Sequence, residues 1–341
     1  MLFRSPRVPH RRHPAVAPHP ARGAPHHRAV VDVSTIGVVV CTHRRERLPL
    51  LRAAIASLHA QTRPPERIAV VVDGDIDLEA EVRAALPGVE VRGLGRNRGV
   101  SVARTVGAGD LDTDLVAFLD DDATAHPDWL EVLEGVLADP EVLGAGGRSD
   151  AVFDAPRPRW LPEEFLWTLG CSYRGQPQER AVVRNVYGGC ALLRRDLFVE
   201  LGGYDPTIGH HGDVAGGGEE AEFCLRATAA TGGSFAYEPA TGIDHRVPGE
   251  RLTWSYFLRR CREEGAMKAR LALAPRAVPG SLGPERSFAL RLPVVALRYL
   301  LVPGPVSGRR AGGAVVLGAG AVLVGLATEL ITRRLRTRRT R

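Results

Sequence analysis

The stretch that decides the fold is "LVAFLDDDA", residues 115–123. Five mostly apolar residues, typical of a buried strand, run directly into Asp120, Asp121 and Asp122. Neighbouring carboxylates repel one another, and no residue of the stretch carries a compensating positive charge. The cluster therefore requires a cation from elsewhere, and the surrounding sequence indicates which kind.

The segments around this strand alternate between strand and helix patterns. A β-branched run at 36–40 is followed by apolar residues at helical spacing up to 58, and the same succession repeats through 67–86, 89–109 and 115–137. Short connections between such units are typical of parallel strands joined by right-handed crossovers. We therefore predict an α/β fold with a mostly parallel open sheet and helices on both of its faces.

Three polar residues, Thr42, Asp73 and Asp120, stand where the predicted strands end. The carboxyl ends of parallel strands meet at one edge of a sheet, where ligands bind, and the loop "HRRER" brings Arg44 and Arg47 to that edge. Carboxylate oxygens suit Mg²⁺ or Mn²⁺, which proteins hold through one or two carboxylates and the phosphates of a substrate. We expect a divalent cation and a diphosphate here. The alternative is a solvated acidic turn that caps the following helix.

The composition argues against several other classes of protein. The 341 residues include 45 Lys and Arg against 39 Asp and Glu, a net charge of +6, and the arginines gather at both ends of the chain. Basic ends favour contact with an anionic surface such as a membrane over a nucleic-acid groove. No glycine follows the first strand in "CTHRRER", and Lys268 is the only lysine, so a dinucleotide fold and a P-loop are disfavoured. Five cysteines without CxxC spacing indicate a reducing cytosolic compartment.

The second half of the chain adds acids, a histidine and two tryptophans. The glycine pair of "NVYGGCALL" lets a ligand approach the backbone or forms only a turn. Glu219 and Glu220 begin a predicted helix after a glycine-rich loop, where acids favour the helix dipole or meet an incoming substrate. His245 is either a metal ligand or a structural hydrogen-bonding residue. Trp160 and Trp167 either stack on a sugar or an isoprenoid, or pack in the core.

These motifs make the chain resemble the family 2 glycosyltransferases of the GT-A fold over residues 34–265. The matching segments, in order, are "VVVCTHRRERL", Asp73, "GRNRGVSVARTVG", "FLDDD" as a version of the DXD motif, "GGCALLRRDLFVELGGYD" and "GEEAEFCLR". The resemblance implies inverting transfer of a sugar from a nucleotide-diphosphate donor, a UDP-sugar, to an acceptor hydroxyl or phosphate. The rival interpretation is a sugar-nucleotide-binding or scaffolding protein of the same fold that has lost the chemistry. A nucleotidyltransferase would require a loop with glycine and lysine after the first strand.

The resemblance also implies roles for individual residues. Asp122 and His245 would hold Mg²⁺ or Mn²⁺, and Asp120 would contact the ribose. Glu220 would be the catalytic base where the family usually has an aspartate, with Glu219 and Glu222 as alternatives. The implied donor-binding residues are Thr42, Arg44, Arg47, Asp73, Asn97, Arg104, Asp120 and Asp121, and the implied acceptor-side residues are Trp160, Trp167 and Gly189.

The chain divides into three predicted parts. Residues 1–33 are a basic tail rich in Pro and His without a signal peptide, which we expect to be disordered. Residues 34–265 are the transferase domain, and 266–341 are a membrane-associated helical segment with a basic tail. The 18 residues at 311–328 carry no charge and are long enough to cross a bilayer. Because nucleotide sugars are cytosolic and arginines stay on the cytosolic side, we expect the protein at the cytoplasmic face of the cell membrane. Its expected partners are the donor, a lipid-linked or polysaccharide acceptor and the membrane surface, with no nucleic acid.

Overall fold

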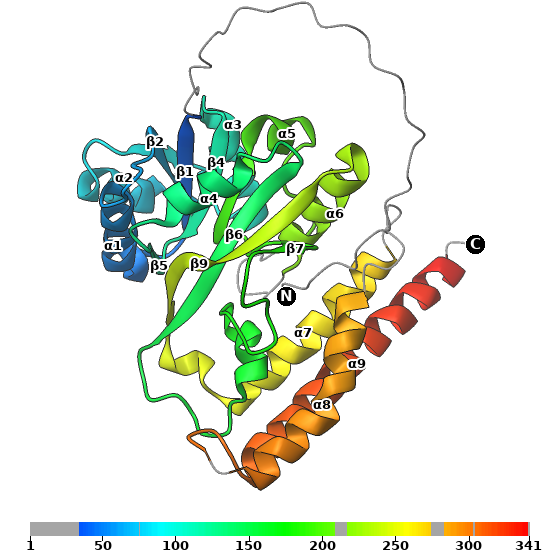
Figure 1. Cartoon of the computed structure of the whole chain (residues 1–341). Helices are drawn as coiled ribbons and strands as arrows, with labels where there is room; N and C mark the ends of the chain where they lie inside the picture. The colour runs from blue at the N-terminus through cyan, green and yellow to red at the C-terminus, as the bar shows by residue number, and fades with distance from the viewer. Residues whose placement is uncertain (1–33, 75, 209–216, 274–282, 303, 340–341) are drawn as a thin grey trace, which may run out of the picture.

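The structure is a computed structural model that describes residues 34–74, 76–208, 217–273, 283–302 and 304–339. The predicted tail at 1–33 therefore lies outside the described residues. Figure 1 shows an α/β body with a layer of long helices beside it. The first half of the chain forms β1 (Ile36–Thr42), η1 (Arg45–Arg47), α1 (Leu48–His59), β2 (Arg67–Val72), α2 (Ile76–Ala85), β3 (Glu90–Gly93), α3 (Val100–Asp110), β4 (Leu115–Asp120), β5 (Ala123–Ala125), α4 (Trp129–Leu137) and β6 (Val142–Phe153).

The second half completes the sheet and adds the helical layer. Its elements are η2 (Glu163–Leu169), β7 (Ala181–Val183), β8 (Cys190–Arg194), α5 (Arg195–Glu200), α6 (Glu219–Thr231), β9 (Ser234–Val247), η3 (Gly249–Arg251), α7 (Trp254–Ala272), α8 (Gly283–Leu301) and α9 (Arg309–Arg339).

All the described strands belong to one sheet, in the order β3-β2-β1-β4-β8-β6-β9-β5, with β7 paired to β9. The predicted parallel arrangement holds for β1 to β4. Beyond them, β8 runs antiparallel to both β4 and β6, so the sheet as a whole is mixed. The order reverses between β1 and β4, because the chain first builds β2 and β3 on one side and then returns. Such a switch point opens a crevice at the carboxyl ends of the two strands.

Helices cover both faces of the sheet because its buried strands are apolar on both sides. Val38 and Val40 of β1 face the side on which α1, α2 and α4 pack. Val39, between them, faces the side on which α3, α5 and α6 pack. This alternation is the period of two expected along a strand, applied to a run that is buried throughout. The predicted open sheet with helices on both faces is confirmed.

The strands β6 and β9 extend the sheet beyond the helix-covered body. They pair in parallel over most of their length, with irregularities in register near Gly144 and Arg148. The short strand β5 pairs antiparallel with β9, and its register sets Ala123 opposite His245. The pairing therefore holds His245 beside the aspartates that immediately precede β5, although these aspartates lie far from His245 in the sequence.

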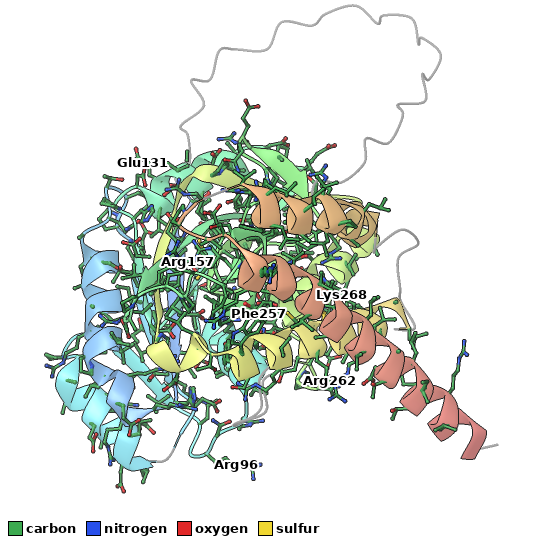
Figure 2. All side chains as sticks on the ribbon, turned by 90° about the horizontal axis from the view of Figure 1, so that it is seen from below. Arg96, Glu131, Arg157, Phe257, Arg262 and Lys268 are labelled. Carbon is green, nitrogen blue, oxygen red and sulfur yellow. The ribbon has the colours of Figure 1, made fainter. Side chains whose placement is uncertain are left out.

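The helices α7, α8 and α9 form a layer of their own, which lies to one side of the sheet in Figure 1. Figure 2 shows α7 and α9 alongside each other. A Cβ at Gly265 of α7 would overlap the carbonyl oxygen of Val322, and one at Gly325 of α9 would overlap that of Arg262. The two helix backbones are thus in direct contact, which only glycine allows. Because α7 continues past residue 265, it crosses the predicted boundary between the transferase domain and the membrane segment.

The apolar helix α9 fits the predicted membrane segment in length. Within the described residues it is the one helix long and apolar enough to span a bilayer, over 27 residues from Arg309 to Leu335. Only 22% of its most apolar window is buried against the rest of the protein. The helix α8 contains Pro293 and leaves Leu290 and Val294 exposed as well. The layer therefore presents a broad apolar surface outward.

Candidate active site

A pocket of about 810 Å³ opens at the switch point between β1 and β4. It is lined by the ends of these strands, the loop after β1, the glycine pair before β8, the start of α6 and one face of α7. This volume lies within the usual range for small-molecule sites. Most of the predicted site residues line it: Thr42, Arg44, Arg47, Asp73, Asn97, Arg104, Asp120, Asp121, Asp122, Trp167, Gly189, Glu219, Glu220 and His245.

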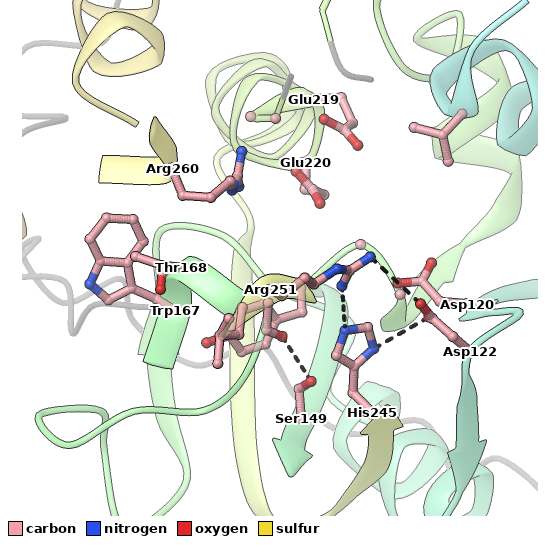
Figure 3. A pocket seen from close by; sticks show the side chains of 18 of the residues that line it. Asp120, Asp122, Ser149, Trp167, Thr168, Glu219, Glu220, His245, Arg251 and Arg260 are labelled. Atoms are coloured by element: carbon pink, nitrogen blue, oxygen red, sulfur yellow. Dashed lines mark hydrogen bonds and ion pairs between the residues drawn. The ribbon is translucent and has the colours of Figure 1, made fainter. Parts of the chain in front are cut away.

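The acidic cluster and His245 meet in this pocket, as Figure 3 shows. Ligand atoms of Asp120, Asp122 and His245 all lie within 4.8 Å of one another. The His245 Nδ1 atom is 3.4 Å from Asp122 Oδ1, and both side chains are buried. Two carboxylates and an imidazole form a donor set that suits Mn²⁺ or Mg²⁺. The residues present therefore fit a divalent cation.

Two arginines provide positive charge to the aspartates. Arg47 places Nη1 2.5 Å from Asp121 Oδ1 and Nη2 3.1 Å from Asp122 Oδ2. Burial together with the charge of Asp122 raises the pKa of Asp121 to about 6, although Arg47 acts in the opposite direction. The buried Arg104 donates from Nη2 to Asp120 Oδ1 at 2.7 Å. Part of the positive charge that the aspartates need therefore comes from Arg47 and Arg104.

The neighbouring acids at the start of α6 occupy different environments. Glu219 is 3% exposed and lies 3.4 Å from Arg104 Nη1. Burial and the adjacent Glu220 raise the pKa of Glu219 to about 8, with Arg104 opposing the rise. Glu220 is only half-buried, and Figure 3 shows its carboxylate directed into the pocket. Glu219 therefore forms part of the buried wall, whereas Glu220 is accessible to a ligand.

Gly188 and Gly189 stand between the metal-type cluster and Glu220. A Cβ at Gly189 would overlap the Asp120 carboxylate, and a Cβ at Gly188 would lie 2.5 Å from Glu220 Oε1. The carboxylates of two distant segments therefore pack directly on this backbone. The pair forms a turn, closed by the Cys190 N–H that donates to Tyr187 O at 3.1 Å, and these side chains pack closely on it; the approach of a ligand to this backbone stays a prediction. The sequence pattern singled out Gly189, and the matching requirement at Gly188 emerges only from the packing.

The other predicted donor residues surround the strand ends. Asp73 accepts the backbone N–H groups of Arg98 and Gly99, at 2.5 and 2.9 Å, and so anchors the start of α3. Asn97 is exposed on the same loop, and Arg44 donates to His43 Nε2 at 3.1 Å. A structural role for Asp73 is evident. Its predicted role in donor binding, like those of Asn97 and Arg44, stays a prediction.

The two tryptophans predicted on the acceptor side have different positions. Trp167 in η2 is buried and lines the pocket. Trp160 stacks on Trp254, with ring centroids 4.2 Å apart, and meets Phe257 edge-on. It is not among the described residues that line the pocket. Core packing describes both tryptophans, since Trp167 also belongs to a buried apolar cluster with Phe165, and the predicted contact of Trp167 with an acceptor stays a prediction.

Sequence reasoning missed a group of pocket residues on η3 and α7. Arg251 lies 3.5 Å from His245 Nε2 and 3.9 Å from Asp122 Oδ2. Further along, one face of α7 contributes Tyr256, Arg259, Arg260, Glu264, Met267 and Lys268. The basic run "RRCREEG" was the available signal. It could not be assigned to the pocket because nothing local indicates which face of α7 turns towards the sheet.

The sequence matches the profile of "Glycosyl transferase family 2" over residues 37–202. It is 35% identical over 237 residues to the glucosyl-dolichyl phosphate glucuronosyltransferase of Haloferax volcanii, covering 68% of this chain and 76% of that protein. It is 29% identical over 251 residues to the succinoglycan biosynthesis protein ExoM of Rhizobium meliloti, covering 71% and 76%. Among solved structures, the mannosyltransferase PcManGT from Pyrobaculum calidifontis, in complex with GDP-Man and Mn²⁺, superimposes with a TM-score of 0.54 at 17% identity and covers 88% of both chains.

The fold and the site together define a glycosyltransferase of the GT-A fold. The switch-point pocket, with acids after β4 and at the start of α6, has the features expected of that class. The protein belongs to glycosyl transferase family 2. The predicted family and fold are confirmed, and so is the prediction of a glycosyltransferase.

Proposed function

We propose that this enzyme transfers a sugar from a UDP-sugar, with inversion and with the help of Mg²⁺ or Mn²⁺, to a lipid-linked or envelope-glycan acceptor at the cytoplasmic face of the membrane. The observation that carries this proposal is one pocket with a metal-type cluster and a separate accessible carboxylate. Asp120, Asp122 and His245 form the cluster, and Glu220 faces the same space from α6. The glycine pair keeps the two groups close without a side chain between them.

The donor would occupy the strand-end half of the pocket. Asp122 and His245 would hold the cation, with Asp120 beside them, and the cation would neutralise charge that develops on the departing diphosphate. Thr42, Asp73 and Asn97 surround the space proposed for the nucleoside. Arg47 remains close enough to the cluster to contribute positive charge, since its guanidinium already contacts two of the aspartates.

Glu220 would act as the general base. Its carboxylate accepts the proton of an acceptor hydroxyl while that oxygen bonds to the anomeric carbon, and the bond from that carbon to the diphosphate breaks. One displacement inverts the anomeric configuration. The raised pKa of Glu219 argues against it as the base at neutral pH, because a carboxyl that keeps its proton cannot accept another. Its contact with Arg104 supports a structural role instead.

The acceptor assignment is supported by the helical layer and by a relative. The Haloferax volcanii relative is a glucosyl-dolichyl phosphate glucuronosyltransferase by name. In this chain the outward residues of α9, among them Val316, Leu323 and Val324, are more than half exposed. Large exposed apolar surfaces mark contacts with another protein or with a membrane. Replacing Leu323 and Val316 by glutamine should lower the fraction bound to neutral vesicles, whereas glutamine at the already polar Arg310 position should have a smaller effect.

Nucleotide release from a panel of nucleotide sugars tests the proposal most directly. The full-length protein with Mn²⁺ should release nucleoside diphosphate from one UDP-sugar, and release should accelerate when a lipid-linked acceptor is added. Chelation should abolish both rates. Release that a chelator does not affect would contradict the role of Asp122, and donor binding without turnover on any acceptor would favour the rival binding protein.

A further inference from the structure

The pocket continues past Glu220 along one face of α7. Tyr256, Arg260, Glu264 and Lys268 follow one another at intervals of four residues and all line the pocket. This spacing places them on one side of a helix. The reaction proposed above uses none of these side chains. The question is therefore what a row of charged residues does next to the acceptor position.

The charges of this face do not cancel. Lys268 Nζ is 2.9 Å from Glu264 Oε1; burial would raise the pKa of Glu264, but the charges of Lys268 and Arg260 lower it. Arg260 contacts Glu263 Oε2 at 2.9 Å, and Arg259 reaches the other oxygen of the same carboxylate at 3.8 Å. Two guanidinium groups therefore share one carboxylate, which leaves a net positive charge at this end of the pocket.

Arg260 lies on the opposite side of Glu220 from the metal-type cluster, and Arg259 lines the same pocket. Figure 3 shows Asp120 and Asp122 to one side of Glu220 and the Arg260 side chain reaching towards it from the other. Arg260 is mostly enclosed, with 17% of its side chain exposed. Arg259 is more open at 57% and lies over the ring of Tyr256. The proposed donor diphosphate would lie near the aspartates, so the positive charge that remains after both arginines share Glu263 is left for a different anion.

The reverse face of α7 leads to the apolar layer. Gly265 and Gly325 bring the backbones of α7 and α9 into contact. The pocket arginines therefore stand about one helix diameter, roughly 10 Å, from the near face of α9, and the exposed apolar residues of α9 lie on its outer face. A molecule with its head in the pocket and an apolar tail would find a charged subsite and an apolar surface in succession.

We propose that Arg259 and Arg260 form the subsite for the phosphate that joins the acceptor sugar to its lipid. This inference rests on the function proposed above and specifies its acceptor as a glycosyl phospholipid, with a sugar hydroxyl at Glu220 and the phosphate at the arginines. The planar guanidinium group suits this role because its N–H donors match phosphate oxygens in pairs. A neutral glycan acceptor would leave the positive charge of this subsite without a partner.

A matched pair of acceptors tests the subsite. The probes are a glucosyl phosphate ester of a short isoprenoid alcohol and the neutral glucoside of the same alcohol. For the full-length protein, R259Q/R260Q should weaken binding of the phosphate probe about ten- to a hundredfold, the range for lost hydrogen bonds to charged groups. Binding of the neutral probe should change little. R259Q alone, at the more exposed position, should give an intermediate loss.

Arg262 provides the matched control, because it lies on the same helix and Figure 2 shows its side chain pointing away from the body. R262Q removes the same charge and should leave the preference for the phosphate probe intact. Equal losses for both probes, or a loss of UDP-sugar affinity of the same size, would overturn the subsite. Partition onto vesicles with and without anionic lipid separates the other source of phosphate: a loss of vesicle binding with an unchanged probe preference would assign the arginines to bilayer headgroups.

The same measurements distinguish the inference from the function on which it rests. Probe binding is measured without turnover, so a missing preference for the phosphate probe overturns the subsite even where UDP-sugar is consumed. A clear preference together with no nucleotide release from any donor would support the subsite and contradict the proposed transfer reaction.

Discussion

The parallel half of the sheet and the layer formed by α7, α8 and α9 differ in how far their apolar residues are buried. Val38 and Val40 of β1 are completely buried, because helices cover both faces of the sheet. On α9, Val316 and Leu323 are 63% and 65% exposed. The apolar side chains of the sheet are covered by other parts of the chain. Many apolar side chains of the helical layer stay exposed. The comparison teaches that the pocket lies on an edge of the sheet whose apolar residues the chain itself covers, whereas the helices beside it expose an apolar surface, as the proposed membrane contact requires.

The largest expected effect is on kcat, when the proposed general base Glu220 is replaced. Glu220→Gln should lower kcat about 10²- to 10⁴-fold and leave donor affinity unchanged, because a general base contributes on that order. Steady-state transfer kinetics with separate measurement of donor binding provide the test. Normal turnover in this variant, together with a loss in Glu219→Gln or Glu222→Gln, would show that the motif has been assigned in the wrong register.

The next effect concerns the acidic cluster. Asp122→Asn should weaken Mn²⁺ and donor binding together, by at least the 10–100-fold that changes around a metal typically cause. Titration calorimetry with Mn²⁺ and then with the donor measures both. Asp150→Asn is the control, since Asp150 belongs to the other acid–histidine group, with His126 and Asp244, which does not line the pocket among the described residues. Parallel losses in both variants would mean that the effect is not specific to the proposed site.

On the helical side, we expect the α7–α9 crossing to depend on its glycines. Gly325→Val places methyl groups against the α7 backbone and should destabilise the protein by about 1–3 kcal/mol, as overpacking does. Gly320→Ala should have the opposite sign, because a Cβ there meets no atom within 4 Å and alanine favours a helix by up to about 1 kcal/mol. Thermal unfolding in detergent compares the two. Equal melting temperatures would show that α9 does not pack on α7 as described.

A further effect is a pH dependence of stability at Glu219. Its pKa is raised by burial from an ordinary 4.5 to about 8, so between these values the folded protein holds a proton that the unfolded chain releases. Stability should therefore fall as pH rises through this window, by about one to a few kcal/mol. In Glu219→Gln this part of the fall should disappear, which melting temperatures at pH 5 and pH 8 would reveal. Parallel profiles for the two proteins would contradict a buried, protonated Glu219.

Packing also changes one expectation that follows from the sequence. If the segment from 266 onward were a separate anchor, its removal would leave the transferase intact. The structure instead joins it to the body: Glu164 of η2 accepts from Arg298 and from the Tyr299 hydroxyl of α8, each at 2.6 Å. Because η2 also carries Trp167 to the pocket wall, point substitutions on the exposed surface test membrane contact more cleanly than truncation does.

The local pattern of apolar and polar residues was sufficient to predict most of the proposed donor-binding half of the fold. The succession of apolar strands and amphipathic helices predicts β1 to β4 and α1 to α4, and the rule that parallel strands end at one edge brings Thr42, Asp73 and Asp120 together. Each of these inferences uses residues close in sequence and a general preference of the chain. The antiparallel strand β8 and the long pair β6 and β9 carry no comparable local signal, because their pairing depends on distant partners.

By itself the sequence determined the fold class, the family and the position of the acids after β4 and at the start of α6. Only the tertiary structure decided which neighbours complete the site. The register of β5 on β9 sets His245 beside Asp122, close packing requires glycine at 188 and 189, and the rotation of α7 turns Arg260 inward while Arg262 faces out. Strand and helix periodicity show which residues lie on the same face of an element. Which face meets the pocket depends on contacts between distant segments, and these exist only once the chain has folded.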